Sequence, residues 1–214
     1  MESPELARMR SEYARDGLEE AAAGDDPLSL FSRWLDEAVA ADVHEPNAMA
    51  LATATADGRP SSRIVLLKGF DARGIVFFTG YESRKGHELE TNPFAAATML
   101  WHPLQRQVRV EGRVTQLSAG ESDAYFASRP RGSQIGAVAS PQSQAIDDRA
   151  VLERRVAQVE QQFAGRDVER PAEWGGYRIA LDSIEFWQGR VGRLHDRLRF
   201  SRVHGTWTRE RLAP

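Results

Sequence analysis

The sequence has 214 residues, a formal net charge of −3, 41% hydrophobic residues, 28% charged residues and no cysteine. This composition is typical of a globular protein and excludes a disordered chain, and the small net charge gives no indication of a general affinity for nucleic acid. The absence of cysteine excludes disulfides, thiolate metal sites and cysteine nucleophiles. The charged N-terminus is not typical of a secretory signal, and no apolar run reaches the roughly eighteen residues of a membrane span. We therefore expect a cytoplasmic protein with neither nucleic-acid nor membrane partners.

The first half of the chain predicts an arm, a helix and a run of strands. Residues 1–24 are charged and rich in alanine, and we expect an N-terminal arm that can be mobile, followed by one domain over residues 25–214. Asp26-Pro27 predicts the start of a helix of about four turns, because aspartate caps helices and proline fits their first position. The apolar period then changes, and we predict antiparallel strands at residues 48–56, 61–70, 74–80, 94–101 and 105–117.

The second half adds helices and returns to strands. Ser118 and Glu121 have the spacing of a capping box, which predicts a helix that ends at Arg129-Pro130. A long amphipathic helix is expected at residues 147–163. Strands are predicted at residues 175–189, 197–203 and 206–212. The whole is a mainly β fold with flanking helices, and the meandering strands suggest a small closed or half-closed barrel.

Cations gather in two segments of the first half. In RIVLLK, Arg63 and Lys68 bracket four aliphatic residues of a strand that we expect to be buried on both faces. In SRKGHELE, Arg84 and Lys85 follow Ser83 at the expected start of a helix, where free backbone N–H groups favour a phosphate. Each segment also has an ordinary explanation, since cations at strand ends reach solvent and many surface helices are capped by serine.

Two further segments carry similar groups. Residues 125–144 combine tyrosine, arginine, serine and glutamine, whose donors suit phosphate oxygens better than a metal, although a polar loop between helices explains the prolines and glycines equally well. RLHDRLRF, residues 193–200, places four cationic or ionisable side chains on one face if it is a strand, and leucine, phenylalanine and aspartate on the other. These are Arg193, His195, Arg197 and Arg199. Such a stripe is either solvated or meets an anion.

Familiar catalytic motifs are missing. The five histidines have no metal-ligand spacing, and the sequence contains neither a dinucleotide-binding glycine motif, nor a P-loop, nor a hydrolase nucleophile elbow. We therefore expect no metal. Cations and neutral donors without strong acid–base candidates suit a phosphorylated organic ligand whose own chemistry does the work.

Ordered motifs along nearly the whole chain resemble the pyridoxine/pyridoxamine 5′-phosphate oxidase family: DPLSLF, RIVLLK, SRKGHELE, QRQV, YFASRPRGSQIGA, SPQS, WGGYR, IEFWQG, RLHDR and RLAP. The resemblance implies an FMN-binding split β-barrel and a homodimer with flavin sites at the subunit interface. It further implies oxidation of pyridoxine 5′-phosphate or pyridoxamine 5′-phosphate to pyridoxal 5′-phosphate. In that reaction a hydride passes from C4′ to flavin N5, and dioxygen reoxidises the flavin to give hydrogen peroxide.

The resemblance also implies the site residues. For FMN these are Arg63, Val65, Leu66, Lys68, Phe78, Thr79, Arg84, Lys85, Gln107, Gln142, Ser143, Trp187 and Arg197. For the substrate they are Lys68, Tyr125, Arg129, Ser133, Arg193 and His195, the last two being the catalytic pair that lies over the pyridine ring. Arg10 and Tyr13 match an arm that can fold over the substrate as a lid. Arg199 departs from the family pattern, which has an apolar residue there, and we expect it to be a solvated charge.

Two alternatives remain open. One is a split-barrel oxidoreductase that uses another substrate or a deazaflavin, and it predicts degenerate SRPRGS and RLHDR segments, which are intact here. The other is a non-catalytic protein that binds FMN or pyridoxal phosphate, because binding and catalysis would use the same cations.

Overall fold

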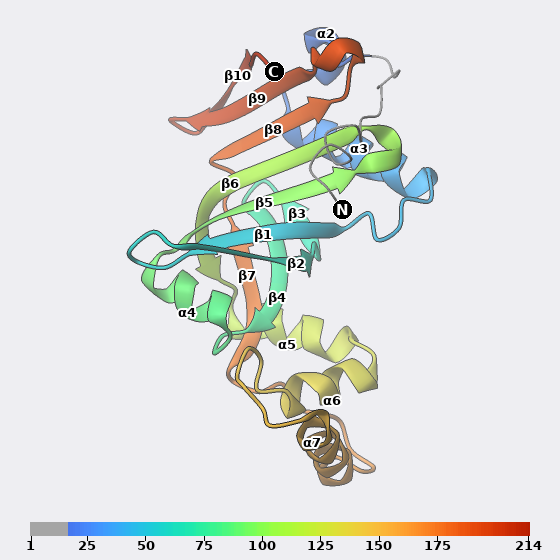
Figure 1. The fold of residues 1–214 in the computed structure, drawn as a ribbon, viewed down its shortest axis with the longest axis vertical. Coiled ribbons are helices and arrows are strands. Elements are labelled where there is room, and N and C mark those ends of the chain that lie inside the picture. Colours follow the sequence, from blue (N-terminus) through green and yellow to red (C-terminus); the bar gives the residue numbers. More distant parts are fainter. Residues whose placement is uncertain (1–16) are drawn as a thin grey trace, which may run out of the picture. The chain divides into compact units, whose positions relative to one another are not determined.

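The computed structural model describes residues 17–214, in which antiparallel strand pairs are flanked by helices (Figure 1). The chain forms two compact units. Among the described residues, the first comprises 17–49, Ala97–Val110 and Asp182–Pro214, and the second comprises Ala50–Ala96 and Glu111–Leu181. Most of the predicted arm lies outside the described residues, as do Arg10 and Tyr13. The division into an arm and one domain stays a prediction.

The first unit is built on paired C-terminal strands. β9 (Asp196–Val203) pairs antiparallel with both β8 (Ser183–Gln188) and β10 (Thr206–Arg211), and β8 also neighbours β6 (Arg106–Gln116). Within residues 17–214 the α-helices of this unit are α2 (Glu20–Ala23) and α3 (Pro27–Ala40). α3 begins as predicted, because the Asp26 carboxylate accepts hydrogen bonds from the backbone N–H groups of Leu28 and Ser29 at 3.1 and 3.2 Å. Trp34 of α3 meets Phe186 edge-on at 5.3 Å, and so joins helix to sheet in the core.

The second unit holds the other strands and most helices. Its strands are β1 (Ala48–Ala54), β2 (Pro60–Leu66), β3 (Gly69–Asp71), β4 (Gly74–Gly80) and β7 (Trp174–Ile179). Its helices are α4 (Arg84–Thr91), α5 (Ala119–Ser128), α6 (Arg131–Ala139) and α7 (Arg149–Gln162). β4 pairs antiparallel with β3 and β7. β5 (Phe94–Trp101) and β6 contribute residues to both units, as does β1, whose first two residues belong to the first unit. Single 3₁₀ turns occur at His102–Leu104 and Val191–Arg193.

Helices α5, α6 and α7 pack side by side (Figure 1). Their apolar side chains form one buried cluster, which includes Phe126, Ile135, Val159, Phe163 and Trp174. The guanidinium group of Arg131 donates to the backbone carbonyls of Phe163 at 2.7 Å and Arg166 at 3.0 Å. The start of α6 therefore caps the carbonyl end of α7.

Most predicted elements are confirmed, but two predicted strands are each divided in two and one helix is missing from the prediction. Residues 175–189 form two strands, because the first part pairs with β4 and the second with β9. Residues 61–70 are likewise divided between β2 and β3. The loop interpretation fails at α6, where Ile135 and Ala139 face the core four residues apart and Pro130 stands at the N-cap, where its missing N–H costs no helical hydrogen bond.

The strand predicted at residues 197–203 is confirmed as β9, but the interpretation of residues 193–200 as one strand holds only from Asp196. β9 begins at Asp196, and Arg193 ends a 3₁₀ turn with φ of +62°. Leu194 is therefore 74% exposed instead of facing the core, whereas Leu198 and Phe200 are fully buried as predicted. The expectation that RIVLLK is buried on both faces is wrong too, because Ile64 is 65% exposed. Among the described residues no helix is long and apolar enough to cross a membrane.

Candidate functional site

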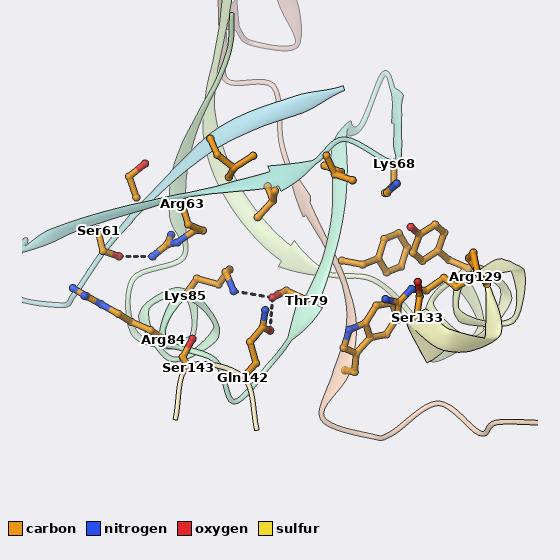
Figure 2. Close-up of a pocket in the computed structure, with 18 residues that line it drawn as sticks. Ser61, Arg63, Lys68, Thr79, Arg84, Lys85, Arg129, Ser133, Gln142 and Ser143 are labelled. Atoms are coloured by element: carbon orange, nitrogen blue, oxygen red, sulfur yellow. Dashed lines mark hydrogen bonds between the residues drawn. The ribbon is translucent and has the colours of Figure 1, made fainter. Parts of the chain in front are cut away.

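A cavity of about 740 Å³ opens in the second unit and brings together residues that lie far apart in the sequence. All of the predicted FMN and substrate ligands of this unit line it: Arg63, Val65, Leu66, Lys68, Phe78, Thr79, Arg84, Lys85, Tyr125, Arg129, Ser133, Gln142 and Ser143. Figure 2 shows two groups of polar side chains: Arg63, Arg84 and Lys85 on one side, and Lys68, Arg129 and Ser133 on the other. The cavity therefore offers two separate places for anions.

Arg63 and Arg84 of the first group share one carboxylate. Arg63 lies on β2 and donates to Thr53 Oγ1 at 2.6 Å, to Ser61 Oγ, and to Glu88 Oε2 at 3.3 Å. Arg84, at the start of α4, donates from Nε to Glu88 Oε1 at 2.9 Å. Both arginines line the cavity, and both are held in place by Glu88, which is not among the residues that line it.

Lys85 is the buried cation of the first group, with 6% of its surface exposed. Its Nζ donates to Thr79 Oγ1 at 2.9 Å and to Ser83 Oγ at 3.1 Å. Burial and the nearby charge of Arg63 lower the pKa of Lys85 to about 8, although the carboxylate of Glu88 acts against this shift. The next residue, Gly86, has no room for a side chain, because a Cβ atom there would lie 1.7 Å from the Tyr81 carbonyl oxygen.

Arg129 of the second group lies over the ring of Trp174, 4.6 Å from its centroid. Tyr125 stacks on Phe78 at 3.8 Å beside it. Burial lowers the pKa of the Arg129 guanidinium, and its Nη1 is buried without a hydrogen-bond partner among the described residues. An unpaired buried donor is costly, so this atom indicates a place where an acceptor from a ligand can bind.

Some of the residues that line the cavity are not predicted from the sequence. Trp174, Ser61, Ser62, Ile64 and Pro130 line the cavity but are not among the predicted ligands. The sequence signal for Trp174 is the following Gly175-Gly176 pair, whose absent side chains permit close packing. Gln142, which is a predicted ligand, is held at the edge of the cavity by accepting from the Gly80 N–H at 2.9 Å and from Thr79 Oγ1 at 3.0 Å.

The remaining predicted site residues belong to the first unit: Gln107, Trp187, Arg193, His195 and Arg197. The ring centroids of Trp187 and His195 are 4.6 Å apart. His195 Nδ1 accepts from the Arg190 backbone N–H at 3.1 Å, so the neutral imidazole carries its proton on Nε2. Burial and the charge of Arg193 lower the pKa of His195, which favours this neutral form near pH 7.

Two arginines of β9 are paired with carboxylates. Arg197 forms a bidentate ion pair with the buried Glu185, donating from Nε to Oε1 at 2.9 Å and from Nη2 to Oε2 at 3.1 Å. It also donates to the Ala213 carbonyl at 2.9 Å. Arg199, expected to be a solvated charge, instead forms a surface ion pair with Glu210 at 2.7 Å. The register of β9 with β10 explains this pair, since the two residues lie directly opposite each other.

No group of three potential metal-ligating side chains lies close enough to hold an ion within residues 17–214. This finding concerns His, Cys, Asp and Glu side chains.

Two solved structures define the fold class. The chain aligns with a pyridoxamine 5′-phosphate oxidase-related, FMN binding protein from Nostoc punctiforme at a TM-score of 0.72 and 17% identity, over 89% of this chain and 100% of that chain. That likeness concerns the fold alone. The chain also aligns with PhzG from Burkholderia lata, in complex with tetrahydrophenazine-1-carboxylic acid, at a TM-score of 0.85 and 36% identity, over 89% of this chain and 94% of that chain. The fold is that of the split-barrel proteins, as the sequence predicts.

Sequence comparisons then define the family. A family model described as pyridoxamine 5′-phosphate oxidase matches residues 35–163, and one described as the pyridoxine 5′-phosphate oxidase C-terminal dimerisation region matches residues 174–214. Proteins named pyridoxine/pyridoxamine 5′-phosphate oxidase from Rubrobacter xylanophilus and Pseudomonas paraeruginosa are each 57% identical over 98% of this chain, covering 97% and 98% of their own lengths. The chain belongs to the pyridoxamine 5′-phosphate oxidase family, and the resemblance to an oxidoreductase of this family is confirmed.

Proposed function

We propose that this protein is an FMN-dependent oxidase that converts pyridoxine 5′-phosphate or pyridoxamine 5′-phosphate to pyridoxal 5′-phosphate. The observation that carries the proposal is one cavity that contains two separate cationic groups (Figure 2), which suits a phosphorylated cofactor beside a phosphorylated substrate. Family membership and 57% identity to proteins of that name support it.

The first group fits the phosphate of FMN. Arg63, Arg84 and Lys85 supply positive charge, and the hydroxyl of Thr79 and the side chains of Gln142 and Ser143 supply neutral donors nearby. The aliphatic residues Val65 and Leu66 and the ring of Phe78 line the same cavity and suit a planar ring system. FMN, when bound, supplies the acceptor for a hydride and passes the electrons to dioxygen, which yields hydrogen peroxide.

The second group fits the phosphate of the substrate. Lys68 and Arg129 supply charge, while Tyr125 and Ser133 supply hydroxyl donors. The buried, unpaired Nη1 of Arg129 would gain its missing acceptor from a phosphate oxygen. In this role the four residues bind one end of the substrate and so hold its C4′ in position for reaction.

Residues of the first unit have further roles in the proposed reaction, as the resemblance to the family implies. Arg193 and His195 orient the pyridine ring, with neutral His195 donating from Nε2, and Gln107, Trp187 and Arg197 contact the flavin. Four of these five residues lie in the part of the chain that matches the dimerisation region, residues 174–214. This overlap supports a homodimer in which the flavin sites lie at the subunit interface.

A ring carboxylic acid is the second candidate substrate. It is favoured by the TM-score of 0.85 to PhzG, whose structure contains tetrahydrophenazine-1-carboxylic acid. Lys68 and Arg129 can bind a carboxylate as well as a phosphate. The sequence identity to the pyridoxine/pyridoxamine 5′-phosphate oxidases is 57%, against 36% to PhzG, and this difference leads us to prefer the phosphate substrate.

Anaerobic absorbance spectra test the function. The protein is reconstituted with FMN, and the visible flavin absorption is recorded before and after addition of pyridoxamine 5′-phosphate. We expect the flavin bands to bleach, and hydrogen peroxide to form when air is admitted. Pyridoxamine without its phosphate is the control and should bleach the flavin far more slowly. Bound flavin that stays oxidised with the phosphate substrate would contradict the proposal, and bleaching by tetrahydrophenazine-1-carboxylic acid alone would favour the second candidate.

A further inference from the structure

A buried carboxylate lies beside the first cationic group, close to where the proposed function places a phosphate. Glu88 of α4 is 4% exposed. Its Oε2 accepts from the hydroxyls of Thr53 and of Ser61, the latter at 2.6 Å, and from Arg63 Nη2 at 3.3 Å. Its Oε1 accepts from Arg84 Nε at 2.9 Å. All four partners therefore donate to one carboxylate, two of them as cations.

Glu88 stays ionised in this setting. Burial raises the pKa of Glu88, but the hydrogen bonds from Ser61, Thr53, Arg84 and Arg63 together outweigh burial and lower that pKa to about 2. The carboxylate therefore carries a full negative charge at neutral pH. A negative charge near a bound phosphate repels it and weakens its binding, unless the same charge also stabilises the groups that bind the phosphate.

The charges of the group balance those of a phosphate monoester. Arg63, Arg84 and Lys85 contribute three positive charges and Glu88 removes one, which leaves a net charge of about +2 opposite a ligand phosphate of about −1.5 to −2. Glu88 also favours the protonated form of Lys85, whose pKa is otherwise lowered by burial and by Arg63.

The geometry of the two arginines explains why a carboxylate is useful there. The side chain of Arg84 is 64% exposed and reaches the cavity from the first turn of α4, so without a partner it would sample many rotamers. Its pairing with Glu88 spans one helical turn, the i to i+4 spacing at which such side chains meet. Arg63 comes from β2, and the same carboxylate connects this strand to the helix.

We propose that Glu88 is the positioning residue of the phosphate subsite: it does not touch the flavin, but it holds Arg63 and Arg84 in the arrangement that binds the flavin phosphate. The inference rests on the proposed function, because it assigns the first cationic group to that phosphate. It predicts that Glu88 matters for a flavin that carries a phosphate and not for one that lacks it.

Titration of the flavin-free protein with two flavins tests this role. FMN and riboflavin share the ring system, and only FMN has the phosphate. The affinities are measured from the change in flavin fluorescence for the wild type, Glu88→Gln and Glu90→Gln. We expect Glu88→Gln to weaken FMN binding by about tenfold or more, with riboflavin binding unchanged, because a charge-assisted hydrogen-bond network is lost. Glu90→Gln, which changes an exposed residue of the same helix, should alter neither affinity.

Each other outcome overturns the inference. An equal loss for FMN and riboflavin would mean that Glu88 only stabilises the fold, and an unchanged FMN affinity would mean that the arginines need no carboxylate. If Glu88→Gln does not fold, Glu88→Asp keeps the charge and shortens the side chain. The preference for FMN over riboflavin should still fall in that variant, and an unchanged preference would overturn the inference. A wild type that binds neither flavin would overturn the proposed function as well, which distinguishes the two failures.

Discussion

Among the residues that line the cavity, Lys85 is the cation whose charge depends most on its surroundings. Its folded pKa of about 8 lies below its ordinary value of 10.5, because burial and Arg63 disfavour the ammonium form. In the flavin-free protein, Lys85 is therefore protonated below about pH 8 and loses its proton as the pH rises through this value. A bound phosphate favours the protonated form, so phosphate binding is weaker above that pH.

We accordingly predict that FMN affinity falls as the pH is raised from about 7 to about 9.5. The FMN phosphate is mostly doubly ionised at pH 7, and its remaining ionisation at higher pH only increases its negative charge, so it does not explain a fall in affinity. Fluorescence titration at a series of pH values measures the effect. Lys85→Arg is the control. The guanidinium group of this variant stays protonated over the whole range, so its affinity for FMN should depend much less on pH. An affinity of the wild type that is constant over the range would contradict the prediction.

At the scale of elements, α6 shows how a helix that was not predicted supports the site. The segment that carries Arg129 and Ser133 is held between α5 and α7 by a buried apolar cluster. Arg131, at the start of α6, donates to the carbonyl of Phe163, the C-cap of α7, and to that of Arg166 in the turn after the helix. The two helices therefore stabilise each other through a cap between residues that lie more than 30 positions apart in the sequence.

We predict that Arg131→Ala lowers the free energy of unfolding by about 1 kcal/mol, because two carbonyls lose a charged donor. Chemical denaturation followed by circular dichroism measures this loss. Arg149→Ala is the matched control on α7. Its ion pair with Glu153 is exposed at both ends, so we expect a change near zero. Equal effects of the two variants would show that the cap contributes nothing specific.

At the scale of the whole molecule, the match to a dimerisation region supports a homodimer. Trp187, Arg193, His195 and Arg197 all fall within this region. If the flavin sites lie at the subunit interface, subunit dissociation and flavin release must be coupled.

We therefore predict that dilution which separates the subunits also releases FMN. Analytical ultracentrifugation at two wavelengths follows the protein mass and the flavin absorption together. The expected result is a flavin signal that sediments only with the species of twice the chain mass. Circular dichroism at the same dilution controls for unfolding. A folded monomer that retains flavin would refute the interface location.

The amino-acid sequence was sufficient to predict the starts of α3 and α5, most strands, the family and the members of the two cationic groups. These depend on local chemistry: Asp26 and Ser118 cap the turns that follow them, and RIVLLK and SRKGHELE carry their cations in order. Only the tertiary structure decided which partners those cations have. Glu88 meets Arg63 across 25 positions, and β9 begins only at Asp196, after a 3₁₀ turn that includes Arg193. The reason is that such contacts depend on which strands and helices pack together, and a local pattern contains no information about them.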